Sequence, residues 1–156
     1  MSPTLPGFLY EPRQPARAIL LAWPLVTIPA LGLAALWAWL LPGAETPVFE
    51  GDPKIVFFLV EVFAPLVESL IMAAVLELLL RFVPPAWAIG LSAIGWGVAH
   101  SIQAPTWGLV IWWPFLIFST LYVTWRQRSK LGAVGIAAAV HALNNLIPAL
   151  LLLRSA

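Results

Sequence analysis

The stretch GIAAAVHALNNLIPALLLL, residues Gly135–Leu153, is apolar enough to cross a lipid bilayer, yet it carries one histidine and two asparagines near its middle. A helix of about 20 residues crosses the ~30 Å hydrocarbon layer. Polar side chains at that depth are costly, so they usually face the interior of a helix bundle and serve a function. The stretch therefore predicts a transmembrane helix that contributes polar groups to an interior site.

The composition of the whole chain agrees with a membrane protein. Of the 156 residues, 62% are hydrophobic and 10% are charged, whereas soluble globular domains average about 45–50% and about 25%. The absence of cysteine excludes disulfides, thiolate metal sites and a cysteine nucleophile. A net charge of +1 offers no basic patch, so nucleic acid is not expected as a partner.

The apolar runs predict an all-α integral membrane protein, a single bundle of about five transmembrane helices. The first run exceeds the length of a signal-peptide core and has no clear cleavage site after it, so we expect it to be retained. A short, extended, Pro-rich tail on the cytoplasmic surface of the membrane is expected to precede the bundle, over residues 1–17. The bundle itself covers residues 18–156, with spans at about 18–41, 55–83, 87–103, 107–125 and 131–153.

The basic residues predict the orientation of this bundle. Only Lys54 and Arg154 fall on the side of the C-terminus. Six others fall on the side of the N-terminus: Arg13, Arg17, Arg81, Arg126, Arg128 and Lys130. Because cytoplasmic loops are enriched in Lys and Arg, the N-terminus is expected in the cytoplasm and the C-terminus outside.

Three glutamates lie in the second predicted span, and they differ in their surroundings. Glu77 lies four residues before Arg81, a favourable spacing for a helical ion pair, so a structural role is expected. Glu61 and Glu68 are seven residues apart and share a helix face in the predicted α-helix. Glu68 lies at the midpoint of its span with no basic residue within a turn, so its partners are expected on other helices.

Histidines supply those partners. His141 and Asn145 are four residues apart on one face of the last span, and Trp96 and His100 are four apart in the third. Each of these polar side chains, taken alone, is explained by hydrogen bonding between helices. One acid, two imidazoles and one amide from three spans together predict a site. The residues expected to wall this site are Trp96, Met72 and Glu61.

Three motifs in this order resemble the CPBP intramembrane proteases, also called the Abi or CAAX-protease family. The first motif reads APLVESLIMA at 64–73, the second WGVAH at 96–100 and the third HALNN at 141–145. The resemblance covers residues 63–148, over half of the chain. Ser69 and Ala73 depart from the family pattern, which has a second glutamate and an arginine at these two positions.

The resemblance implies an intramembrane endopeptidase that hydrolyses a peptide bond of a membrane-associated substrate. Glu68 would be the general base for the attacking water, assisted by His100, and His141 and Asn145 would donate hydrogen bonds to the oxyanion. No cofactor is expected, although zinc on Glu68, His100 and His141 stays open. The implied surroundings are membrane lipids, in the inner membrane of a prokaryote.

Two alternatives remain open from the sequence. The departures at Ser69 and Ala73 are compatible with an inactive family member that serves as a small structural or interaction subunit, with partner membrane subunits. A transporter would use Glu61, Glu68 and the histidines as a proton relay. Transporters of that kind favour repeated halves and broken helices, and the sequence shows neither clearly.

Overall fold

The computed structural model describes residues 5–154, which form helices and no strand. The first element is a 3₁₀ turn, η1. The element η2 is a π-helical turn between α2 and α3. The bounds are η1 Gly7–Tyr10, α1 Pro15–Leu40, α2 Pro53–Phe58, η2 Leu59–Phe63, α3 Ala64–Leu79, α4 Pro85–Ser101, α5 Pro105–Trp125 and α6 Lys130–Arg154. Because α2, η2 and α3 are continuous, residues 15–154 contain five continuous helical segments, called rods here.

Prolines and one acidic cap set where these helices begin. Proline occupies the first turn of α1, α2, α4 and α5, where its missing N–H leaves no hydrogen bond unmade. Asp52 caps α2, because its carboxylate accepts hydrogen bonds from the backbone N–H of Lys54 at 2.8 Å and of Ile55 at 3.3 Å. The rod with the three glutamates is therefore anchored at its beginning.

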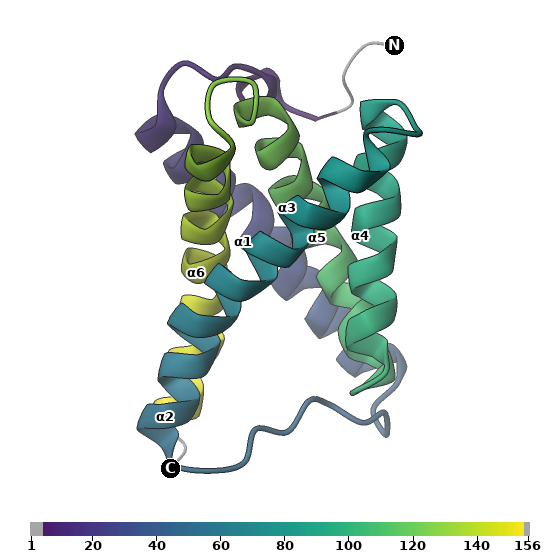
Figure 1. Cartoon of the computed structure of the whole chain (residues 1–156). Coiled ribbons are helices and arrows are strands. Elements are labelled where there is room, and N and C mark those ends of the chain that lie inside the picture. Colours follow the sequence, from purple (N-terminus) through teal and green to yellow (C-terminus); the bar gives the residue numbers. More distant parts are fainter. Residues whose placement is uncertain (1–4, 155–156) are drawn as a thin grey trace.

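The rods have the length and composition of membrane spans. Within residues 5–154, four helices are long and apolar enough to cross a bilayer: 15–40, 53–79, 105–125 and 130–154. The fifth rod, α4, has 17 residues and is about 25 Å long at ~1.5 Å per residue. The protein is thus an all-α integral membrane protein. Figure 1 shows α1 beginning and α6 ending at opposite ends of the bundle.

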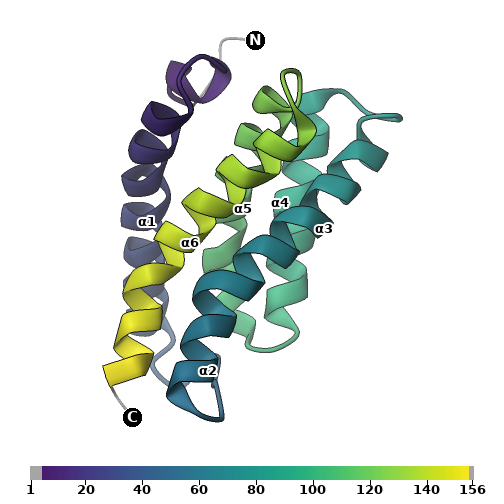
Figure 2. The ribbon, with the colours of Figure 1, turned by 60° about the vertical axis from the view of Figure 1, so that its left-hand side comes forward.

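The helices are arranged around α5, which is buried along its second half, from Pro114 to Trp125. Helices α1, α4 and α6 all pack on α5. Figures 1 and 2 show α3 lying beside α4 near their connection and diverging from it toward α2. Helices α3 and α4 are therefore close together at the end where α1 begins, while the end of the second segment that carries α2 lies near the end of α6.

Helices α4 and α5 approach each other closely at two glycines. A Cβ atom at Gly108 would overlap the carbonyl oxygen of Gly97 and the hydroxyl of Ser101. A Cβ at Gly97 would lie 3.1 Å from the carbonyl oxygen of Gly108. Small residues of this kind let membrane helices pack backbone against backbone. The contact fixes the last turn of α4 against the first turns of α5.

A proline inside α1 gives another contact between helices. Pro29 has no N–H to donate to the carbonyl of Leu25, four residues earlier. The indole of Trp113 on α5 donates to that carbonyl instead, at 3.1 Å. The freed acceptor is thereby satisfied by a neighbouring helix, as transmembrane prolines require.

The structure corrects two expectations. Residues 7–17 are not an extended tail, because η1 packs on α5 with Leu9 fully buried and α1 already begins at Pro15. Glu77 does not pair with Arg81, which lies beyond the end of α3. The carboxylate of Glu77 is instead bound by a cluster of three groups from other helices: Tyr122 at 3.0 Å, Arg126 through two bonds and Lys130 at 2.7 Å.

This cluster joins α3, α5 and α6 at the end of the bundle where α1 begins. Arg126, just past the end of α5, has its pKa raised further above its usual range by the hydrogen bonds from its guanidinium to Glu77. The cation is therefore held at any working pH.

Candidate active site

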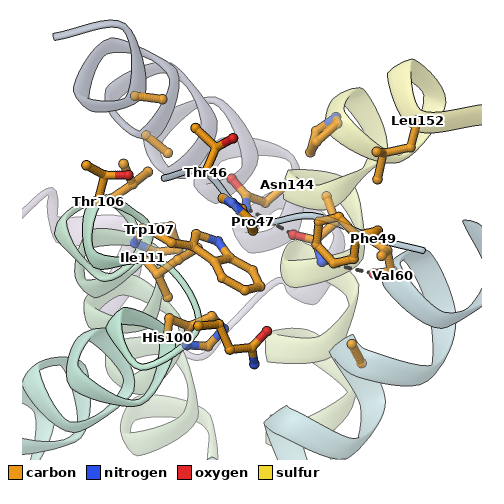
Figure 3. A pocket seen from close by; sticks show the side chains of 18 of the residues that line it. Thr46, Pro47, Phe49, Val60, His100, Thr106, Trp107, Ile111, Asn144 and Leu152 are labelled. Carbon is orange, nitrogen blue, oxygen red and sulfur yellow. Dashed lines mark hydrogen bonds between the residues drawn. The ribbon is translucent and has the colours of Figure 1, made fainter. Parts of the chain in front are cut away.

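The bundle contains a cavity of about 820 Å³, and the four predicted catalytic residues line it. Figure 3 shows His100 on the wall of this cavity. Glu68 comes from α3, His100 from the last turn of α4, and His141 with Asn145 from the middle of α6. The cavity also receives residues from α1 and α5. Five rods and the segment 42–50 thus surround one site.

The carboxylate of Glu68 lies between the two imidazoles. Its Oε2 atom is 3.8 Å from Nε2 of His141 and 4.0 Å from Nε2 of His100. Both separations exceed a direct hydrogen bond and suit one bridging water. The side chain of Glu68 is 24% exposed, whereas those of His100 and His141 are 10% and 7% exposed. The carboxylate is thus the group of this trio most open to the cavity.

His100 is fixed in one tautomer when it is neutral. Its Nδ1 atom lies 2.8 Å from the carbonyl oxygen of Trp96, one turn back on α4. A carbonyl only accepts, so Nδ1 carries the proton and Nε2 is an acceptor that faces Glu68. The edge of the ring meets Trp107 at 4.7 Å between centroids, as Figure 3 illustrates. His100 can therefore accept a proton or a hydrogen bond from a water beside Glu68.

Aromatic rings of α5 hold His141. Its imidazole stacks on Phe118 at 4.7 Å and 24° between planes, and Phe115 lies edge-on at 5.5 Å. Phe115 also borders His100, at 5.8 Å. Nδ1 of His141 is buried without a hydrogen-bond partner among residues 5–154. The ring is held by packing, and its Nε2 atom faces Glu68.

The carboxamide of Asn145 is held at both ends. Its Nδ2 atom donates to the carbonyl oxygen of Val60 at 3.0 Å, and its Oδ1 atom accepts from Nδ2 of Asn144 at 3.3 Å. Thr27 on α1 donates its hydroxyl to Oδ1 of Asn144, also at 3.3 Å. Because Nδ2 has two hydrogens and Val60 takes one, the other is free to bind an oxygen in the cavity.

The strap, residues 42–50, crosses the mouth of the cavity, as Figure 3 shows for Thr46, Pro47 and Phe49. Two contacts hold it to the first turn of α5. The hydroxyl of Thr106 donates to the carbonyl of Glu45 at 3.0 Å, and Phe49 meets Trp107 edge-on at 5.8 Å. Trp107 therefore contacts both the strap and His100.

The three residues predicted as the wall of the site do not line the cavity. Trp96 lies behind His100, stacked on Phe115 at 4.3 Å, and Met72 is fully buried in the core. Glu61 lies in η2, where the π turn inserts one extra residue and rotates it off the face of Glu68. The seven-residue spacing that placed both glutamates on one face assumed an unbroken α-helix.

The two departures from the family pattern are enclosed by protein. Ser69 is fully buried, and its hydroxyl has no hydrogen-bond partner among residues 5–154. Ala73 is 7% exposed and belongs to the core. A glutamate and an arginine at these positions would therefore point into the bundle rather than into the cavity. Their absence leaves the four groups around the cavity in place.

No group of three metal-ligating side chains with suitable geometry occurs within the part of the chain that the structure describes. In the trio for which the sequence left zinc open, Oε2 of Glu68 lies 3.8 Å from Nε2 of His141 and 4.0 Å from Nε2 of His100.

Three features of the site were not predicted from the sequence: the positions of Thr27 and Trp107 on the cavity wall, and the role of Asn144 in orienting Asn145. Thr27 is the only hydroxyl in the apolar run 18–41, which is a signal that could have marked it. Nothing in the sequence distinguishes Trp107 from other tryptophans expected at the membrane interface. Its position beside His100 depends on how α5 packs on α4.

The fold and the site together define the class of protein. It is an all-helical membrane bundle that encloses a carboxylate, two imidazoles and a carboxamide. A family model described as type II CAAX prenyl endopeptidase Rce1-like matches residues 51–147, more than half of the chain. The chain belongs to this family of CAAX proteases, which confirms the resemblance, and all three motifs lie within the matched range. Curated proteins and solved structures give no match.

Proposed function

We propose that this protein is an intramembrane endopeptidase in which Glu68 activates a water to hydrolyse a peptide bond of a membrane-associated substrate. The observation that carries the proposal is the position of the Glu68 carboxylate, 3.8 and 4.0 Å from the two imidazoles on the wall of the cavity. A general base contributes about 10²- to 10⁴-fold to such a reaction.

Each group then has a role that its surroundings support. Glu68 takes a proton from the water, and the Nε2 acceptor of His100 holds the other hydrogen of that water in place. The attacking oxygen adds to the peptide carbonyl, and the free Nδ2 hydrogen of Asn145 and an N–H of His141 stabilise the oxyanion. The proton held by Glu68 passes to the leaving amine as the carbon–nitrogen bond breaks.

Substrate access is proposed from the end of the bundle where α6 ends, because the cavity lies beneath the strap at that end. Six of the eight basic residues lie toward the other end, where α1 begins. With the N-terminus in the cytoplasm, as the positive-inside rule predicts, the cavity opens on the outer side. We place the protein in the inner membrane of a prokaryote, in contact with membrane lipids, with a peptide anchored in the same bilayer as its substrate.

The test is hydrolysis by the purified protein in lipid nanodiscs. Peptides anchored by a prenyl chain, by an acyl chain or by a transmembrane helix are incubated in H₂¹⁸O and analysed by mass spectrometry. We expect at least one class to be cleaved, with a single ¹⁸O in the new carboxylate. We also expect cleavage to survive chelation, with no metal bound at unit stoichiometry. Loss of activity on chelation would replace the metal-free mechanism by a zinc site.

A second candidate is an inactive subunit of a larger membrane complex, and the substitutions at Ser69 and Ala73 favour it. It predicts that a partner membrane subunit copurifies in fixed stoichiometry in mild detergent. It also predicts that no anchored peptide is cleaved. The two candidates therefore give opposite results in the nanodisc assay.

A further inference from the structure

The carbonyl of Val60 lies where its own rod provides no donor. In η2 the backbone N–H of Ala64 donates to the carbonyl of Leu59, five residues back, rather than to Val60 four residues back. The next bond of this π-type would run from residue 65 to Val60, but residue 65 is proline, which has no N–H.

Asn145 uses this free acceptor. Its Nδ2 atom donates to the Val60 carbonyl at 3.0 Å, across 85 residues of sequence. Since a carbonyl cannot donate, this bond fixes which end of the carboxamide is the nitrogen. Asn144, held in turn by Thr27, then supplies a hydrogen to Oδ1 of Asn145 at 3.3 Å. The amide is thus oriented by one backbone acceptor and one side-chain donor.

The fold uses the same device where α1 meets α5. There Pro29 leaves the carbonyl of Leu25 without a helical donor, and Trp113 donates to it. Leu25 and Trp113 do not line the cavity, whereas Asn145 and Val60 both do. The carbonyl freed by Pro29 therefore accepts a hydrogen bond that joins two helices away from the cavity. The carbonyl freed by Pro65 belongs to a residue that lines the cavity.

We propose that Pro65 and Asn144 are positioning residues that set the Asn145 carboxamide, so that its second Nδ2 hydrogen stays directed at substrate. Pro65 acts by keeping the Val60 carbonyl free of backbone partners, and Asn144 acts by binding Oδ1 of Asn145. The use of that hydrogen for an oxyanion rests on the proposed function. The orientation of the amide itself does not.

The first measurement is independent of hydrolysis. The chain has only two asparagines, so labelling with [¹⁵N]asparagine gives two side-chain amide signals by NMR in nanodiscs. Asn145→Leu removes one of them and so assigns the Asn145 signal of the wild type. We expect the wild-type Asn145 amide to have one downfield proton that exchanges with solvent at least about tenfold more slowly than a free amide.

Pro65→Ala restores an N–H that competes for the Val60 carbonyl. The downfield Asn145 proton is expected to move upfield and to exchange at least about tenfold faster. The matched control is Pro85→Ala, at the start of α4, where the restored N–H has no helical partner to take. It is expected to leave the Asn145 signal unchanged. Thr27→Ser keeps the hydroxyl and should preserve the signal, whereas Thr27→Val should alter it.

The second measurement uses a peptide that the wild type cleaves. Pro65→Ala and Asn144→Leu should each lower kcat by about 10- to 100-fold, less than the ~10²–10³ for outright removal of an oxyanion donor, with KM unchanged. If Pro65 and Asn144 had only a structural role, their variants would lose stability without a fall in kcat at unchanged KM.

The proposal is overturned if Pro65→Ala and Asn144→Leu, both folded, keep the wild-type exchange rate of the Asn145 amide. Should Pro65→Ala fail to fold, Asn144→Leu and Thr27→Val decide. If the wild type cleaves no peptide, the proposed function fails, while the NMR result still decides how Asn145 is oriented.

Discussion

The contact between Gly97 and Gly108 predicts a graded response to added methyl groups. In Gly108→Ala the new Cβ would overlap the Gly97 carbonyl oxygen and the Ser101 hydroxyl, far inside the ~3.3 Å at which carbon and oxygen normally meet. The backbone atom cannot rotate away, so α4 and α5 must separate. Overpacking of this kind costs about 1–3 kcal/mol, and we expect the upper end of that range.

Two glycines of α4 calibrate this cost. In Gly97→Ala the nearest atoms are the Gly108 carbonyl oxygen at 3.1 Å and Trp112 Cβ at 3.2 Å, so a shift of a few tenths of an ångström suffices and about 1 kcal/mol is expected. A Cβ at Gly95 would meet no atom within 4 Å. Gly95→Ala should therefore be neutral or stabilise the helix by up to about 1 kcal/mol.

The assay is reversible unfolding in mixed detergent micelles, followed by the fluorescence of the nine tryptophans. The expected order of stability is Gly95→Ala, then Gly97→Ala, then Gly108→Ala. Because Gly108 follows Trp107, which borders His100, the last variant should also lose hydrolysis. If Gly108→Ala unfolds within about 0.5 kcal/mol of wild type, the size usual for a surface substitution, α4 and α5 do not meet as described.

Two further predictions concern the ends of the bundle. Glu77→Gln leaves Arg126 and Lys130 without their carboxylate, and it should lower the free energy of unfolding by about 1–3 kcal/mol in the same assay. The control, Arg81→Gln, should change the free energy of unfolding by no more than about 0.5 kcal/mol. Equal effects of the two variants would contradict the cluster around Glu77. In this cysteine-free chain, Val48→Cys on the strap should react with a membrane-impermeant maleimide from outside the cell. Gln127→Cys should react only after permeabilisation, and the reverse pattern would contradict the orientation.

The helices could be predicted from the sequence because two simple signals agree. Apolar runs of about 20 residues mark membrane spans, and prolines mark where helices begin. The structure has a helix in each predicted range, with ends that differ by a few residues. The four candidate site residues could also be proposed, because each is a polar group that lipid would penalise unless it faces the interior.

Other features depended on information that spacing does not carry. The π turn at Leu59–Phe63 lies in an apolar run with no local signal except Pro65 after it, yet it rotates Glu61 away from Glu68. The partners of Glu77 lie 45 to 53 residues away in sequence, so an i,i+4 rule selected Arg81 instead. Both errors came from treating one rod as an uninterrupted α-helix whose polar groups pair locally.

The most direct test of the account compares two glutamates of one rod. Glu68→Gln and Glu61→Gln remove the same charge, but only Glu68 lines the cavity beside both imidazoles. With a peptide that the wild type cleaves in H₂¹⁸O, Glu68→Gln should lower kcat by at least about 10²-fold, while Glu61→Gln should still release an ¹⁸O-labelled product. Full hydrolysis by Glu68→Gln would contradict the account.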